Sequence, residues 1–186
     1  MSALLCHAGT SQLLIIDIQE KLASAMRDKV LSNILRTNQV LLQACSALSI
    51  PVLHTEQYPK GLGHTHADLQ SSLTQHPPAL EKTCFSGCAA SGIETNLADP
   101  TRNQIILTGM ETHICVLQTC IQLLDEGKQV FVVEDGVCSR DKKHFKNAIN
   151  RMRQAGAIIT NRESVLFEWL GDASHPQFRE LSKLIR

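Results

Sequence analysis

The stretch QIILTGMETHICVLQTC, residues 104–120, contains the pattern that decides the fold. Its first part, QIILTG, is a short and almost uninterrupted apolar run, which predicts a buried β-strand. The part that follows continues as ETHICVLQTCIQLLDEG and predicts a helix that Gly127 ends. A strand followed directly by a helix is the repeating unit of parallel α/β folds.

The same alternation of apolar runs and amphipathic segments extends through the chain. Further strands are predicted at 13–19, 51–57, 79–87, 128–135 and 157–160. Helices are predicted at 30–49 and 141–154, with a short one in 88–100 and two pieces around 164–170 and 176–185. Several of the strands are apolar at every position, as expected when helices cover both faces of a sheet. We therefore predict a single doubly wound α/β domain, a three-layer α/β/α sandwich over residues 1–186.

The composition argues against several classes of protein. Eighteen basic residues balance eighteen acidic ones, so the chain lacks the basic excess typical of nucleic-acid or anionic-membrane binding. No apolar run approaches the roughly 20 residues of a membrane span. The N-terminal sequence MSALLCHAGTSQ lacks the features of a signal peptide. We expect a cytoplasmic protein whose seven cysteines are reduced thiols.

The fold class also indicates where to look for a site. In doubly wound folds the ligand lies beyond the carboxyl ends of the strands. Polar residues that follow the predicted strands are therefore candidates: Asp17, Gln19, Glu56, Gln57, Tyr58, Lys82, Gly109, Glu111, Thr112, His113, Cys115, Asp135, Ser139 and Arg140.

Cys115 lies near the N-terminus of the helix predicted after residue 110. Unpaired N–H groups and the helix dipole are expected to lower the pKa of a thiol there, which favours a nucleophile over a core residue. Cys120 is five residues further on and projects roughly 140° away, so it is expected in the core. His113 points to nearly the opposite side of a regular helix and is not predicted to be the base for Cys115.

Asp17 interrupts the apolar run LLIIDI. A lone carboxylate is costly to bury without a partner. It is either a structural residue, in a helix cap or a salt bridge, or a general base whose pKa is tuned by nearby charge. Lys82 is the cationic partner that its position favours.

Metal and nucleotide sites are not favoured. His64 and His66 form an H-x-H in a loop, but His54 and His76 stand at no ligand-like spacing from them. Cys84 and Cys88 lack the further cysteines of a zinc or iron–sulfur site. The chain contains neither a GxGxxG nor a GxxxxGK[ST] motif. We expect no metal and no cofactor.

Three segments, LLIIDIQ with Asp17, EKTCFS with Lys82 and GMETHICVLQT with Cys115, resemble the isochorismatase-like cysteine hydrolase family. The last fits the family pattern G-x-x-T-x-x-C-V-x-x-T. TEQYPKGLG and GDASHPQFRELSKLI are similar to the isochorismatase domain-containing branch of that family, so the resemblance covers nearly the whole chain. It implies a Rossmann-like, six-stranded parallel sheet in the order 3-2-1-4-5-6. It also implies a homo-oligomer of two or more subunits.

The resemblance further implies a catalytic set of Asp17, Lys82 and Cys115. Cys115 would attack a carbonyl-type carbon, Asp17 would move the proton, and Lys82 would hold Asp17 and favour the anionic states. A cis peptide bond at Met110–Glu111 would turn backbone N–H groups, including that of Cys115, towards an oxyanion. The implied reaction is hydrolysis of a small amide-, imide- or ester-like C–N or C–O bond. The stretch HTEQYPKGLG lacks the D-x-H…H arrangement of metal-binding nicotinamidases.

The substrate contacts are predicted from position alone. They are Gln19, Tyr58, Phe85, Thr112 and His113. The expected partner is a small molecule, rather than a nucleic acid or a membrane. Two other functions stay open: a non-catalytic member of the family that binds small molecules or proteins, and a thiol redox protein. In a redox protein, Cys115 would be oxidised to a sulfenic acid, and Cys84 or Cys138 would have to lie close enough to act as the resolving thiol.

Overall fold

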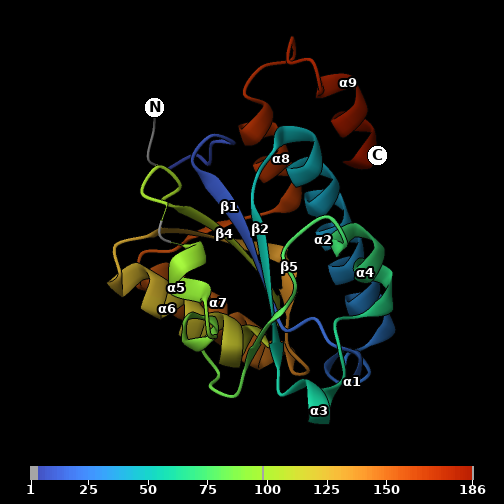
Figure 1. Cartoon of the computed structure of the whole chain (residues 1–186), viewed down its shortest axis with the longest axis vertical. Coiled ribbons are helices and arrows are strands. Elements are labelled where there is room, and N and C mark those ends of the chain that lie inside the picture. Colours follow the sequence, from blue (N-terminus) through green and yellow to red (C-terminus); the bar gives the residue numbers. More distant parts are fainter. Residues whose placement is uncertain (1–3, 98, 186) are drawn as a thin grey trace.

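A computed structural model describes residues 4–97 and 99–185, and Figure 1 shows how its elements are arranged. Its centre is a six-stranded sheet in the order β3-β2-β1-β4-β5-β6, with every neighbouring pair parallel. The strands are β1 (Ser11–Ile16), β2 (Val52–Gln57), β3 (Leu80–Lys82), β4 (Gln104–Met110), β5 (Gln129–Cys138) and β6 (Ile158–Thr160). The predicted fold class and strand order are confirmed.

Helices cover both faces of this sheet (Figure 1). One face carries α2 (Asp28–Leu48), α4 (Ala67–Leu73) and α8 (Arg162–Leu170). The other carries α5 (Ile93–Asn96), α6 (Leu117–Asp125) and α7 (Lys142–Gln154). Short helices complete the chain: α1 (Glu20–Ala23), α3 (Pro59–Leu62), α9 (Phe178–Leu181) and the 3-10 turns Gly87–Ala89 and Ser182–Ile185.

The central strand β1 shows why the strands read as apolar at every position. Leu13 and Ile15 point into the core beneath α2 and α8. Leu14 and Ile16 point into the core beneath α6 and α7. All four side chains are buried, because side chains alternate between the two faces of a strand and both faces are covered here.

Gly109 lies where β4 runs beside the end of β1, in register with Ile16. Its φ is 123°, in the region that favours glycine. A Cβ at this position would overlap the backbone of Ile16. The close approach of the two strands therefore requires glycine.

The predicted elements differ from the observed ones mainly at their ends. β1 stops at Ile16 rather than residue 19, and β5 continues to Cys138, with a register shift against β4 between Leu107 and Gly109. The helix predicted from residue 111 begins instead as a π-helical turn, Thr112–Val116. Among the described residues of the segment 88–100, the regular elements are the end of a 3-10 turn and α5. Residues 1–3, 98 and 186 of the predicted domain lie outside the described residues.

All seven cysteines are free thiols; Cys84 is exposed and the other six are buried. Within residues 4–97 and 99–185, no helix is both long and apolar enough to cross a membrane.

Candidate active site

Asp17 follows β1 directly and turns the chain away from the sheet. Its φ of 49° is in the left-handed region, which costs most residues about 1 kcal/mol or more but which aspartate tolerates better than most. Its carboxylate is fully buried and accepts a hydrogen bond of 2.7 Å from Thr55 Oγ1 on the neighbouring strand. The second carboxylate oxygen lies 2.6 Å from Lys82 Nζ. Asp17 is thus half of a buried ion pair, and the cap position of α1 is taken by Gln19.

Lys82 is the last residue of β3, and its side chain is also fully buried. Besides Asp17, its ammonium has three oxygen neighbours: Gln57 Oε1 at 2.7 Å and the carbonyls of Phe85 at 3.0 Å and Cys84 at 3.3 Å. An ammonium can only donate hydrogen bonds, so these acceptors replace the water lost on burial. The pairing of Asp17 with Lys82 expected from their positions is present.

Cys115 lies in the π-helical turn and is only 6% exposed. Its thiol lies close enough to Asp17 and Lys82 for both groups to shift its pKa. Burial and the negative charge of Asp17 raise the pKa of this thiol to about 12, against the opposing effect of Lys82. The expectation of a lowered pKa is wrong, because loss of hydration and a neighbouring carboxylate outweigh the helix start.

The turn that carries Cys115 is wider than an α-helical turn. The N–H of Val116 donates to the carbonyl of Glu111, five residues earlier, at 3.3 Å. The hydroxyl of Thr119 donates to the carbonyl of Cys115 at 2.6 Å and so holds the start of α6 against the turn. Single π-helical turns of this kind are frequent at functional sites.

The segment before the turn is tied to the loop after β5. The peptide bond Met110–Glu111 is cis, and Met110 is fully buried. The Glu111 carboxylate accepts a hydrogen bond from the backbone N–H of Arg140 at 3.0 Å and pairs with Arg140 Nε at 2.9 Å. Glu111 and Arg140 therefore join the ends of β4 and β5 beside Cys115.

His113 contacts Ser139 and His144. Its Nδ1 is 3.0 Å from Ser139 Oγ, and its ring lies 4.7 Å from that of His144 on α7. Burial lowers the pKa of His113, and nearby Glu111 opposes that shift. These contacts agree with the prediction that His113 does not serve Cys115 as a base.

The other predicted substrate contacts have differing surroundings. The Gln19 amide donates to the carbonyls of Gln57 and Gly63 and accepts from the N–H of Gln57, so it holds the loop after β2. Tyr58 and Phe85 are each 54% exposed; the N–H of Tyr58 donates to the carbonyl of Lys82, and Lys82 Nζ donates to the carbonyl of Phe85. Substrate contact by these residues stays a prediction.

Thr112 is fully buried, and its Oγ1 has no hydrogen-bond partner among the described residues. It precedes Cys115 in the same π-helical turn. A buried hydroxyl without a partner is uncommon in folded proteins, and such groups often belong to a site.

Two residues of β2 support the site; Gln57 was a candidate from the sequence, whereas Thr55 was not. Thr55 contacts Asp17, and Gln57 contacts Lys82. The sequence did contain a signal for Thr55: it is two residues from Gln57, so the two side chains share a face of the strand next to β1. The sequence pointed instead to the carboxylate of Glu56 between them, which contacts Thr65 and His64.

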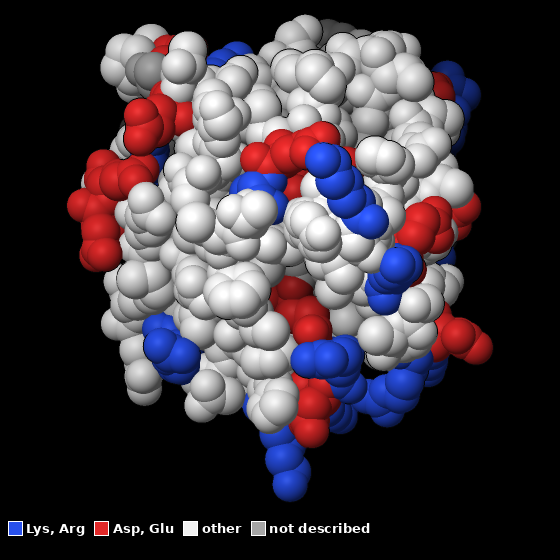
Figure 2. Space-filling view, turned by 60° about the horizontal axis from the view of Figure 1, so that its bottom comes forward, with Lys and Arg blue, Asp and Glu red and all other residues white. Residues whose placement is uncertain are grey.

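The described residues contain no group of three or more histidine, cysteine, aspartate or glutamate side chains arranged to hold a metal ion. Figure 2 turns the end of the molecule that carries α1 and α3 towards the viewer. On this face basic and acidic side chains are interspersed, with broad neutral areas between them.

Together these features define a doubly wound α/β protein with a buried Asp–Lys–Cys cluster at the carboxyl ends of β1, β3 and β4. The family model for the isochorismatase domain matches residues 11–164. The chain therefore belongs to the isochorismatase-like hydrolase family.

Individual relatives cover nearly the whole chain. Isochorismatase domain-containing protein 2 of Bos taurus is 39% identical over 178 residues, which are 96% of this chain and 84% of the relative. Isochorismatase family protein 1B of Dictyostelium discoideum is 36% identical, over 92% of this chain and 84% of its own. A solved structure described as MAR1 ribonuclease of Caenorhabditis elegans has a TM-score of 0.91 and 41% identity, covering 97% of this chain and 92% of that one.

Proposed function

We propose that this chain is a cysteine hydrolase that cleaves a small amide-, imide- or ester-like C–N or C–O bond through a covalent intermediate on Cys115. The observation that carries the proposal is the position of the Cys115 thiol, which is close enough to both members of the buried Asp17–Lys82 pair for each to shift its pKa. The steps below use only side chains of the chain itself.

The raised pKa indicates that Cys115 rests as a thiol. When the substrate carbonyl reaches it, the Sγ–H proton passes to the Asp17 carboxylate while the sulfur forms a bond to the carbonyl carbon. The carbonyl π electrons move to the oxygen, which becomes an oxyanion. Asp17 is then neutral, so Lys82 loses its counter-ion and its positive charge stabilises the new anion instead.

Collapse of this intermediate breaks the C–N or C–O bond and leaves a thioester on Cys115. The leaving group takes the proton held by Asp17. Water then attacks the thioester, giving its proton to Asp17, and the departing sulfur takes that proton back. Each proton that leaves a nucleophile is therefore returned to a leaving group, and the enzyme ends in its starting state.

The oxyanion needs donors close to Cys115. We assign this role to the backbone around Met110–Glu111 and to the N–H of Cys115. The unpartnered hydroxyl of Thr112 is a further donor available to the substrate. Tyr58 and Phe85, the exposed aromatic residues beside Lys82, are proposed to contact the apolar part of the substrate.

The direct test is to trap the thioester. The protein is mixed with an activated small ester such as 4-nitrophenyl acetate and with a panel of small amides and imides, and intact-mass spectrometry locates any acyl adduct. We expect acylation at Cys115 that is lost in Cys115→Ala and retained in Cys84→Ala, the matched change at the exposed cysteine. Acylation that persists in Cys115→Ala with an unchanged rate would contradict the proposal.

The open alternatives have separate readouts. A binding-only protein would show ligand-induced thermal stabilisation without turnover, equally in wild type and Cys115→Ala. A redox protein would form a sulfenic acid at Cys115 with peroxide. Because the C. elegans neighbour is described as a ribonuclease, the same assay is also run with an RNA oligonucleotide as the substrate. The interspersed charges on the face in Figure 2 favour a small neutral substrate over a polyanion.

We propose in addition that the chain assembles as a homo-oligomer. The exposed aromatic side chains of Tyr58, Phe85 and Phe167 are available to such contacts. Light scattering after size exclusion measures the mass directly, and a mass of 20.5 kDa at all concentrations would exclude assembly.

A further inference from the structure

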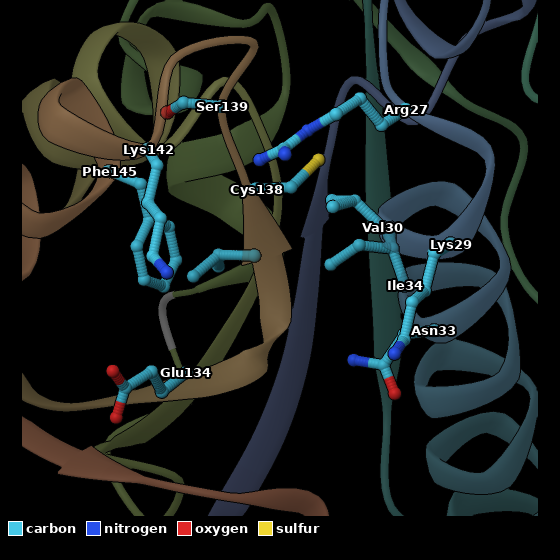
Figure 3. A pocket seen from close by; sticks show the side chains of 11 residues that line it. Arg27, Lys29, Val30, Asn33, Ile34, Glu134, Cys138, Ser139, Lys142 and Phe145 are labelled. Carbon is cyan, nitrogen blue, oxygen red and sulfur yellow. The ribbon is translucent and has the colours of Figure 1, made fainter.

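A cavity lies between α2 and the end of β5. Its volume is about 380 Å³, within the range of small-molecule pockets. Figure 3 shows its two walls, one from the first turns of α2 and the other from the β5–α7 junction. It is lined by Arg27, Lys29, Val30, Asn33, Ile34, Glu134, Val137, Cys138, Ser139, Lys142 and Phe145. None of the three residues of the proposed catalytic cluster is among them.

The walls that face each other are apolar. Val30 and Ile34 come from α2, and Val137 and Phe145 from the opposite side. Cys138, which is 2% exposed, adds a buried thiol with a raised pKa, so this group is uncharged at neutral pH. An apolar group of a ligand placed between these walls would lose contact with water on both sides.

The charges around the cavity are mostly positive and lack partners. Arg27, Lys29 and Lys142 line it, against the single carboxylate of Glu134. None of these four side chains forms an ion pair within residues 4–97 and 99–185, although other basic residues of the same region do. Three cations against one anion leave an excess of two positive charges, which favours a negatively charged ligand.

The charges are also arranged along the cavity. In Figure 3 the guanidinium of Arg27, the residue before α2, extends towards Cys138 and Ser139, whereas Glu134 lies at the far end. A ligand anion therefore belongs at the Arg27 end, with its apolar part running between Val30 and Phe145. Arginine suits this role because its planar donors match a carboxylate.

We propose that this cavity is a binding site for a small organic carboxylate with an apolar body, distinct from the hydrolytic centre. An aliphatic or aromatic acid of a few carbon atoms beyond its carboxylate fits the chemistry of the walls. Ser139 lines the cavity and also contacts His113, which belongs to the turn that carries Cys115.

The test is calorimetric titration at low salt with hexanoate, and with hexylamine and hexan-1-ol as a cationic and a neutral probe of the same chain length. We expect saturable 1:1 binding of hexanoate, at least about tenfold tighter than that of the other two probes. Cys115→Ala should bind hexanoate as the wild type does, because the two sites are separate. Loss of binding in Cys115→Ala, or failure of hexanoate to saturate, would overturn the proposal.

Matched variants locate the site. Lys142→Glu and Arg27→Glu should each weaken hexanoate binding by about tenfold or more. Lys146→Glu, an exposed lysine one turn further along α7 that does not line the cavity, should change it by less than about twofold. Val30→Phe, which fills the space and keeps every charge, should abolish binding while the melting temperature stays close to that of wild type. Equal effects of Lys142→Glu and Lys146→Glu would show non-specific attraction and overturn the assignment.

Discussion

The carboxylate of Asp17 lies 2.6 Å from the ammonium of Lys82, and both side chains are fully shielded from solvent although the residues are 65 positions apart. A buried pair of this kind contributes little net stability compared with apolar residues, but removal of one partner alone is costly. The proton transfer proposed above gives these charges a role that stability alone does not.

Asp17→Asn should remove the proposed proton acceptor and leave Lys82 charged and unpaired. We expect activity to fall about 100- to 10,000-fold and stability to fall by about 3–5 kcal/mol. Hydrolysis rates and urea unfolding measure the two effects. The double variant Asp17→Asn, Lys82→Met should recover stability but not activity. Recovered activity in that double variant would argue against proton transfer by Asp17.

Cys115 should react with iodoacetamide as a thiol of high pKa. With a pKa of about 12, the labelling rate at this residue should rise about tenfold per pH unit between pH 7 and 10. Asp17→Asn should speed labelling at a given pH, because the negative charge of Asp17 raises the pKa. Lys82→Met should slow it, because the positive charge opposes that rise. Site-resolved mass spectrometry gives the rates, and a plateau below pH 9 would contradict the high pKa.

Stability should fall in alkali because several thiols are buried. Burial, the largest cause in each case, raises the pKa of Cys88 to about 11 and those of Cys120 and Cys138 to about 12, from the ordinary 9.0. The unfolded chain then releases these protons at lower pH than the folded one. The stabilisation is complete below pH 9 and is lost as pH rises towards 11–12. Urea midpoints from pH 7 to 10.5 check this, and a midpoint that rises above pH 9 would contradict it.

Gly109→Ala should be far more damaging than Gly127→Ala. Both glycines have positive φ, 123° and 79°, so alanine is strained at either position. At Gly127 a Cβ meets nothing within 4 Å, and the expected cost is about 1–2 kcal/mol. At Gly109 the Cβ would overlap the backbone of Ile16, and we expect a loss above about 4 kcal/mol or no folded protein. Equal melting temperatures for the two variants would be inconsistent with the strand contact described here.

The sheet could be predicted from the sequence because its strands are buried on both faces and therefore read as apolar runs. The Asp17–Lys82 pair could be predicted as well, since residues at the carboxyl ends of parallel strands meet at one edge. The pKa of Cys115 could not, because it depends on how completely neighbouring segments exclude water. Nor could the π-helical turn, which differs from an α-helical start by one hydrogen-bond step and leaves no periodic signal. Thr55 was missed because its role depends on the register of β2 against β1.

The strand order also bears on how the chain emerges from the ribosome. β1, β2 and β3 are neighbours and are synthesised first, so the Asp17–Lys82 pair can form before the nucleophile exists. Until β4 is made, the apolar strand β1 presents an unpaired edge, which invites pairing with another chain. Arrival of β4 closes that edge and brings Cys115 to the pair in the same event. The unpaired edge of a nascent chain therefore moves from β1 to β4 at the moment the chain gains its nucleophile, and β5 covers it only later.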